Sequence, residues 1–109
     1  MAEVVADIAE PLLRNLGDEF DLAAYEGALK AAAVLWNSRL LRIETGLIDP
    51  IAELKAALVT PTPPEFEPLY QEVLDRAELL YPNLDRMIAG VQVVPRPGGG
   101  YRIDVASLG

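Results

Sequence analysis

Apolar residues recur at intervals of three and four between residues 2 and 81, which is the spacing of one face of an α-helix. The first such segment runs from residue 2 to residue 16, and Pro11 interrupts it. A proline inside a helix removes one backbone hydrogen bond and crowds the preceding turn. The pattern therefore predicts a first helix that is kinked or divided in two and that ends at Gly17.

The longest apolar pattern follows and predicts a central second helix. Asp18 and Asp21 are competing candidates for its N-cap, because a short acidic side chain accepts hydrogen bonds from free N–H groups. Gly46 is the residue type that commonly ends a helix. Apolar positions cover most of its circumference, which is typical of a helix packed on several sides. One continuous stripe contains Leu22, Tyr25, Leu29, Ala32, Trp36, Leu40 and Ile43.

Two further helix starts have recognisable chemistry. Asp49 followed by Pro50 predicts the N-cap and first residue of a short third helix. Thr62 and Glu65 have the spacing of a capping box and predict the start of a fourth helix, which Pro82 stops. The apolar face of that helix is expected to contain Phe66, Leu69, Tyr70, Val73, Leu74, Ala77, Leu80 and Tyr81.

After residue 86 the period changes from helical to two, which is the period of a β-strand. The five residues from Arg96 to Gly100 have a length common in β-hairpin loops. We expect Val93 to pair with Ile103 and Val91 with Val105. The alternation places Ile88 on the opposite, mixed face of this hairpin.

Helices come first and strands last, so the predicted fold class is α+β. The expected architecture is a bundle of three or four helices followed by a C-terminal antiparallel β-hairpin. A length of 109 residues fits one domain. We therefore expect a single domain over 1–109, with a helical part over 2–81 and the hairpin over 86–107.

Composition favours association with another protein surface. Hydrophobic residues make up 51% of the chain. Because a small domain has much surface for its volume, some of this apolar surface is expected to be exposed in the monomer. The predicted partner is a second copy of the chain, and a different protein is the alternative.

The charge of the chain argues against nucleic acid as a partner, since basic residues supply most of the affinity for phosphates. The net charge is −8, and residues 1–26 contain seven acidic residues and one basic residue. Residues 86–109 contain Arg86, Arg96 and Arg102 with one acidic residue. Weak nucleic-acid binding through these hairpin arginines is retained as an alternative.

Several kinds of chemistry are excluded by composition. The chain has no cysteine and no histidine, so it lacks thiolate nucleophiles, ordinary zinc sites and the commonest general base. We expect no catalytic residue, no metal site and no cofactor. The amino terminus lacks the features of a signal peptide and no apolar run is long enough to cross a membrane, so a cytoplasmic protein is predicted.

The segment Trp36-Asn37-Ser38-Arg39 has two interpretations. In the favoured one, Trp36 belongs to the apolar stripe and is buried against Leu69 or Val73 of the fourth helix, with its N–H bound to one partner. Asn37 and Arg39 then face solvent or a partner. The alternative is a small-ligand site, binding a carboxylate or phosphate, formed by Trp36, Asn37, Arg39 and Arg42.

The predicted function is a non-catalytic interaction module, most simply a homodimeric adaptor, accessory subunit or small regulator. A two-stranded hairpin has unpaired edges that invite addition of another strand. The expected interface residues are Val91, Val93, Tyr101, Ile103 and Val105. A dimer through the alanine-rich second helix is the competing arrangement, and a small enzyme or ligand-binding protein is the competing function.

Overall fold

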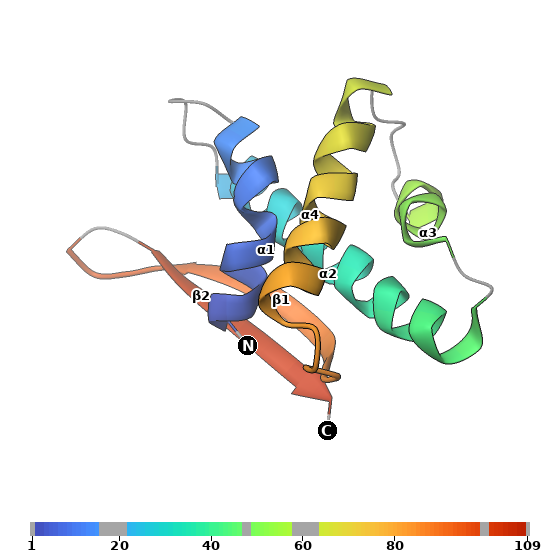
Figure 1. The fold of residues 1–109 in the computed structure, drawn as a ribbon. Coiled ribbons are helices and arrows are strands. Elements are labelled where there is room, and N and C mark those ends of the chain that lie inside the picture. Colours follow the sequence, from blue (N-terminus) through green and yellow to red (C-terminus); the bar gives the residue numbers. More distant parts are fainter. Residues whose placement is uncertain (1, 16–21, 47–48, 58–63, 99–100, 109) are drawn as a thin grey trace.

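The computed structural model describes residues 2–15, 22–46, 49–57, 64–98 and 101–108. Its helices gather on one side of a two-stranded antiparallel hairpin, and this confirms the predicted α+β class (Figure 1). The elements are α1 (Ala2–Asn15), α2 (Leu22–Thr45), α3 (Pro50–Ala57), a 3-10 turn (Pro64–Phe66), α4 (Glu67–Leu80), β1 (Met87–Pro95) and β2 (Tyr101–Leu108).

Helix α1 continues through Pro11, so of the two predicted forms, kinked or divided in two, the divided one is wrong. Pro11 has no N–H to donate to the carbonyl of Asp7, four residues earlier. The Nε of Arg76 on α4 donates to that carbonyl at 2.7 Å. The backbone group that the proline leaves unpaired is therefore satisfied by the neighbouring helix. Gly17, the expected end of this helix, lies outside the described residues.

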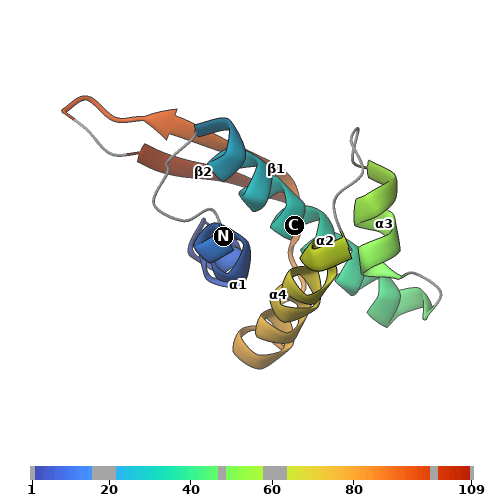
Figure 2. The ribbon, with the colours of Figure 1, turned by 90° about the horizontal axis from the view of Figure 1, so that it is seen from above.

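Helices α1 and α4 lie side by side and run antiparallel (Figures 1 and 2). Arg14, near the end of α1, pairs with Glu72 in the first half of α4 at 3.1 Å. Tyr81, which follows α4, donates its hydroxyl proton to the carboxylate of Asp7 near the start of α1. This hydrogen bond is the main cause that raises the pKa of Tyr81.

Helix α2 is the central element and contacts α1, α3, α4 and β1. It ends as predicted at Gly46, whose φ of +73° is a conformation that favours glycine. The N–H of Gly46 donates to the carbonyl of Arg42 at 2.6 Å. The two N-cap candidates Asp18 and Asp21 lie outside the described residues.

The third helix begins as the sequence predicts. The Oδ1 atom of Asp49 accepts a hydrogen bond from the N–H of Ile51 at 3.1 Å, and Pro50 is the first helical residue. Leu54 on this short helix is buried against the core. Helix α3 contacts α2 and α4 and lies away from the hairpin (Figure 1).

The fourth helix begins later than the capping box predicts. Thr62 lies outside the described residues, Glu65 belongs to the 3-10 turn, and the N-cap residue Phe66 makes no side-chain cap. Pro68 favours the late start, because a proline in the first turn of an α-helix costs no backbone hydrogen bond, whereas a proline in the interior costs one. A helix beginning at the predicted capping box would place Pro68 in its interior.

The apolar face of α4 is largely as predicted. The side chains of Tyr70, Val73, Leu74 and Ala77 are buried. Leu80, which the periodicity also assigns to this face, is 44% exposed because it lies in the last turn of the helix.

The hairpin has the predicted register, with Val93 opposite Ile103 and Val91 opposite Val105. A bulge between Ile88 and Gly90 leaves Ala89 without a partner on β2. Because a bulge inserts one extra residue, it reverses the alternation of side chains along the strand. Ile88 is therefore buried with Val91 and Val93, and its predicted place on the mixed outer face is wrong.

Two glycines, one inside α2 and one directly after it, provide a matched test of the helix and its end. Gly27 lies inside the helix, is exposed, and an added Cβ would meet no atom within 4 Å. We expect Gly27→Ala to stabilise the protein by about 0.5–1 kcal/mol, because glycine is costly inside a helix. Gly46→Ala should destabilise it by about 1 kcal/mol, because alanine is strained at positive φ. Urea unfolding measures both, and effects of the same sign would contradict the account.

Candidate interaction site at the hairpin edges

Trp36 anchors the central helix to the start of the hairpin. Its side chain is 1% exposed, which confirms the expected burial. The indole Nε1 donates to the carbonyl of Arg86, just before β1, at 2.7 Å. The ring also meets Tyr81 edge-on, with 6.3 Å between ring centroids. Trp36 therefore joins α2 to the connection between α4 and β1, and its polar atom is already bound.

Arg39 is buried, so the expectation that it faces solvent is wrong. Its side chain is 2% exposed, and its guanidinium lies 5.0 Å from the centre of the Trp36 ring. Its Nε pairs with the carboxylate of Glu78 on α4 at 2.9 Å. The aromatic face and the carboxylate together compensate part of the desolvation of the charge. Within the described part of the chain, the two Nη atoms have no hydrogen-bond partner.

Asn37 lies on a different side of α2 from Arg39 and binds the backbone of strand β1. Its Nδ2 donates to the carbonyl of Ile88 at 2.8 Å, and its Oδ1 accepts from the N–H of Ile88 at 2.7 Å. A side-chain amide offers one donor and one acceptor side, so it reproduces the pairing of a neighbouring strand. The segment around Trp36 is thus the contact between the central helix and the hairpin.

The four residues of the alternative ligand site do not line one cavity together. Trp36 and Arg39 are adjacent inside the bundle, whereas Asn37 faces the hairpin and Arg42 is exposed one turn later. A surface cavity that contains Asn37 is lined otherwise by Lys30, Ala33, Val34 and residues 88–91. The polar groups of Trp36 and Asn37 are occupied by backbone partners.

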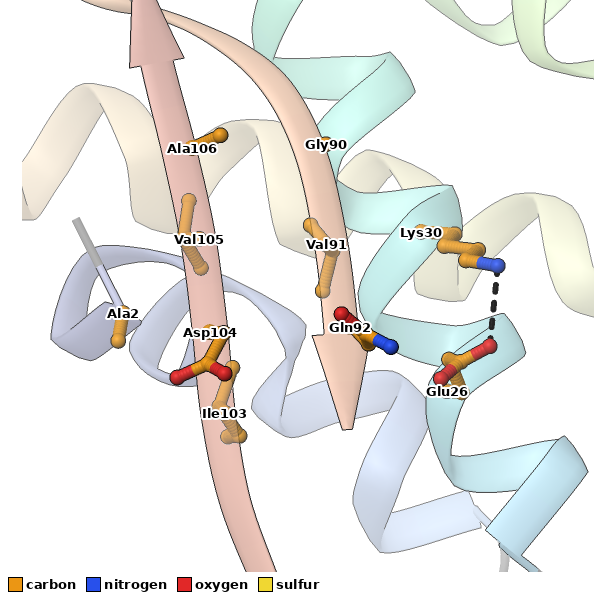
Figure 3. Close-up of a pocket in the computed structure, with 10 residues that line it drawn as sticks. All are labelled: Ala2, Glu26, Lys30, Gly90, Val91, Gln92, Ile103, Asp104, Val105 and Ala106. Carbon is orange, nitrogen blue, oxygen red and sulfur yellow. Dashed lines mark ion pairs between the residues drawn. The ribbon is translucent and has the colours of Figure 1, made fainter. Parts of the chain in front are cut away.

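Glu26 makes a second bond between α2 and β1, and sequence reasoning missed it. Its Oε2 accepts from the N–H of Val93 at 3.0 Å, and its Oε1 pairs with Lys30 at 3.0 Å (Figure 3). The hydrogen bond from Val93 is the main cause that lowers the pKa of Glu26, and the bond from Lys30 adds to it.

The spacing of Glu26 and Asn37 was the signal available in the sequence. Eleven residues make about three helical turns and a rise of about 16 Å, so both side chains share one face of α2. Five residues of a strand span about the same length. Glu26 and Asn37 therefore reach Val93 and Ile88, near the two ends of β1, and occupy the edge that β2 leaves open.

These bonds also fix which backbone groups of β2 point outward. The N–H of Val93 points to Glu26, away from β2, so Val93 and Ile103 form a pair without mutual hydrogen bonds. In such a pair the N–H and C=O of both residues point away from the partner strand. The groups of Ile103 therefore point to the outer edge of β2, and by alternation so do those of Val105.

Ser107 belongs to the same outward set. It is paired with Ile88, whose N–H and C=O are both turned toward Asn37. The outer edge of β2 thus presents the N–H and C=O groups of Ile103, Val105 and Ser107. Within the described ranges, no other segment of the chain binds these groups.

The predicted interface residues occupy different environments. Val91 and Val93 are buried by the protein's own helices, and Ile103 and Val105 are half-buried. Tyr101 is 42% exposed. The accessible part of this predicted set is therefore the backbone of β2 and the side chain of Tyr101.

A shallow cavity of about 840 Å³ crosses the hairpin beside α2 (Figure 3). Its charged lining residues are Glu26, Lys30 and Asp104. Glu26 pairs with Lys30, and Asp104 pairs with Arg102 at 2.9 Å. The charges in this cavity are therefore already balanced by protein partners.

Among the described residues, no cluster of three or more acidic side chains is arranged to hold a metal ion. None of the described helices combines the length and apolarity needed to cross a membrane. Of the hairpin arginines, Arg102 is paired with Asp104 and Arg96 is exposed near the hairpin tip.

Comparison of the chain with protein-family models, with curated proteins and with solved structures finds no match.

The bonds of Asn37 predict a measurable loss of stability. Asn37→Ala leaves the N–H and C=O of Ile88 without partners at a buried residue, and we expect a loss of about 2 kcal/mol in the free energy of unfolding. Gln71→Ala is the control, because among the described residues Gln71 bonds only to the exposed Asp75 on the same helix. Its effect is expected to stay within about 0.5 kcal/mol. Equal effects of the two substitutions would contradict the role given to Asn37.

Glu26 predicts a stabilising contribution that acid removes. Its folded pKa lies below the usual value of 4.5, so its contribution is fully present above pH 4.5 and is lost as the pH falls through the folded pKa. NMR titration of the Glu26 carboxyl measures this directly. Lys30→Gln should raise the pKa only part of the way, because the N–H of Val93 is the larger cause. A Glu26 pKa at or above 4.5 in the unmodified protein would refute this assignment.

Proposed function

We propose that the chain is a non-catalytic interaction module that forms a homodimer through the outer edge of β2, acting as a cytoplasmic adaptor, accessory subunit or small regulator. The observation that carries this proposal is the difference between the two edges of the hairpin. Helix α2 binds the edge of β1 through Glu26 and Asn37, while no described segment binds the edge of β2.

An open strand edge is a template for another strand, because its N–H and C=O groups are spaced for pairing. Proteins that avoid such pairing place proline, lysine or a bulge on the edge. Strand β2 contains no proline and no lysine, and its charged residues Arg102 and Asp104 neutralise each other. The bulge of this hairpin lies on β1. The open edge is therefore the less protected of the two.

A second copy of the chain is a suitable source for the added strand. Two copies of β2 related by a two-fold axis perpendicular to the sheet would make a four-stranded antiparallel sheet. The axis leaves the helices of both copies on the same face of that sheet. A sheet of four strands packed on helices is also more stable than an isolated two-stranded ribbon.

The competing arrangements have less support. A dimer built on the alanine-rich helix α2 would need an exposed apolar face, but Ala32 and Ala33 are buried, and Ala28 and Ala31 are half-buried against the core of the protomer. A ligand site at Trp36 would need free polar groups, but its indole N–H binds Arg86. Nucleic-acid binding through Arg102 would compete with its pairing to Asp104.

Sedimentation equilibrium at micromolar concentration tests the proposal. We expect a dimer, and we expect Val105→Pro to raise its dissociation constant at least about tenfold, because two edge hydrogen bonds worth about 1 kcal/mol each are lost across the two-fold axis. Proline at this position removes an N–H that points outward, so the bonds between β1 and β2 remain.

Val105→Ala is the matched control, because it removes side-chain contacts and keeps the edge N–H. It should retain the dimer, with circular dichroism confirming that both variants are folded. If Val105→Pro does not fold, Ile103→Pro removes another outward N–H of β2 and tests the same edge, because Val93, its partner on β1, turns its N–H to Glu26. A protein that is monomeric at every concentration would refute the proposal. So would a dimer whose dissociation constant is unchanged by both proline substitutions.

A further inference from the structure

We infer that the two copies pair with Ile103 opposite Ile103 at the two-fold axis, so that Arg102 of each copy faces Asp104 of the other. This inference rests on the proposed self-association and adds the register of the interface and the side chains that select it. It follows from the hydrogen-bond pattern of β2, from its charges and from the exposure of Tyr101.

The backbone pattern first restricts the register. Only residues whose N–H and C=O groups point outward can exchange hydrogen bonds with the second copy. Ile103 and Val105 belong to that set, and Arg102 and Asp104 point their backbone groups toward β1. Ser107 belongs to the outward set as well, so the registers that pair Ile103 with this set place it opposite Ile103, Val105 or Ser107 of the second copy. The last of these puts Val105 opposite Val105, and a shift by one residue is not allowed.

The charges then separate the permitted registers. With Ile103 opposite Ile103, Arg102 lies directly opposite Asp104 of the second copy, and this occurs twice. With Ile103 opposite Val105, Asp104 faces Asp104, and like charges directly opposite are destabilising. With Val105 opposite Val105, Asp104 faces Ala106 and gains no partner. The first register is the only one of the three that pairs opposite charges across the axis.

The geometry of a strand pair strengthens this selection. Because Arg102 and Asp104 point their backbone groups away from the new interface, they meet there as a pair without mutual hydrogen bonds. Such pairs have the shorter separation, with Cα atoms about 4.5 Å apart, and their side chains lie closer. Within one copy, Arg102 Nε already lies 2.9 Å from Asp104 Oδ1, and both side chains are exposed. The dimer therefore joins two existing ion pairs into one network of four charges.

Tyr101 supports the same register by a separate route. It is one of the few large apolar side chains exposed in the described part of the chain, at 42%. With Ile103 at the axis, Tyr101 lies opposite Val105 of the second copy, on the face that carries the half-buried Ile103. With Ile103 opposite Val105, Tyr101 would instead face Ser107. The inferred register gives the exposed ring an apolar neighbour.

Charge reversal at the two positions tests the register. Arg102→Asp places four acids together at the axis, and Asp104→Arg places four bases there, so each should raise the dissociation constant of the dimer at least tenfold at low salt. The double substitution R102D/D104R restores opposite charges and should return the constant to within threefold of the original. Arg96→Asp is the matched control near the hairpin tip and should change it less than threefold.

Mixing the two single variants gives a rescue that also shows that both are folded. The copy with two acids and the copy with two bases complement each other, so an equimolar mixture should form a heterodimer more tightly than either variant forms a homodimer. Native mass spectrometry distinguishes the three species, because the substitutions change the mass.

Asp104→Asn distinguishes failure of the register from failure of the proposed function. In the inferred register it removes a favourable pair and should weaken the dimer, whereas in the register with Asp104 opposite Asp104 it should strengthen the dimer. A dimer that Asp104→Asn strengthens, or whose dissociation constant none of the charge reversals changes, would overturn the inferred register. The proposed self-association would not be affected by that result. An original protein that is monomeric at every concentration would overturn both.

Discussion

The hydrogen bonds from α2 to the edge of β1 are the interaction on which the rest of this structure depends. A hairpin of two strands has two edges of unpaired backbone, and such a ribbon is marginal in water. Asn37 binds both backbone groups of Ile88, and Glu26 binds the N–H of Val93. The central helix thereby takes the place of a third strand at the edge of β1, whereas no described segment of the chain binds the edge of β2.

Helix α2 also contacts the start and the apolar face of the hairpin. Trp36 binds the carbonyl of Arg86 directly before β1, so the strand begins at a fixed point beside Tyr81. The bulge then turns Ile88 inward to join Val91 and Val93 in the core. Apolar packing fixes which face of the hairpin is buried, and the hydrogen bonds of Asn37 and Glu26 fix the edge of β1 against α2. Two independent sets of contacts therefore determine the orientation of the hairpin against α2.

The parts of the fold that depend on local sequence were predictable. Helical periodicity located the helices, Asp49 and Gly46 marked the start of α3 and the end of α2, and the alternation around the glycine loop gave the register of Val93 with Ile103. Each of these features follows from residues close together in the chain. Pro68 also gave a local signal for the late start of α4, but the stronger pattern of the capping box concealed it.

The parts that depend on distant contacts were not predictable in the same way. The burial of Arg39 requires the ring of Trp36 and the carboxylate of Glu78 on another helix. The continuity of α1 through Pro11 requires Arg76 to reach the carbonyl of Asp7. The bulge between Ile88 and Gly90 had a weak local signal, because a glycine inside a strand often marks a bulge, but the position of the extra residue depends on the pairing with β2. The sequence places Glu26 and Asn37 eleven residues apart on one face of α2. This spacing predicts contacts with a strand edge only when α2 is known to lie antiparallel to β1.

Amide hydrogen exchange, measured residue by residue over a range of protein concentrations, tests the difference between the two edges most directly. The account predicts that the N–H groups of Ile88 and Val93 exchange slowly at every concentration, because helix α2 of the same copy binds them. The N–H groups of Ile103 and Val105 should exchange rapidly in dilute solution and become protected as the concentration rises through the dissociation constant of the dimer. Rapid exchange of Ile88 and Val93, or protection of Ile103 and Val105 that does not change with concentration, would contradict it.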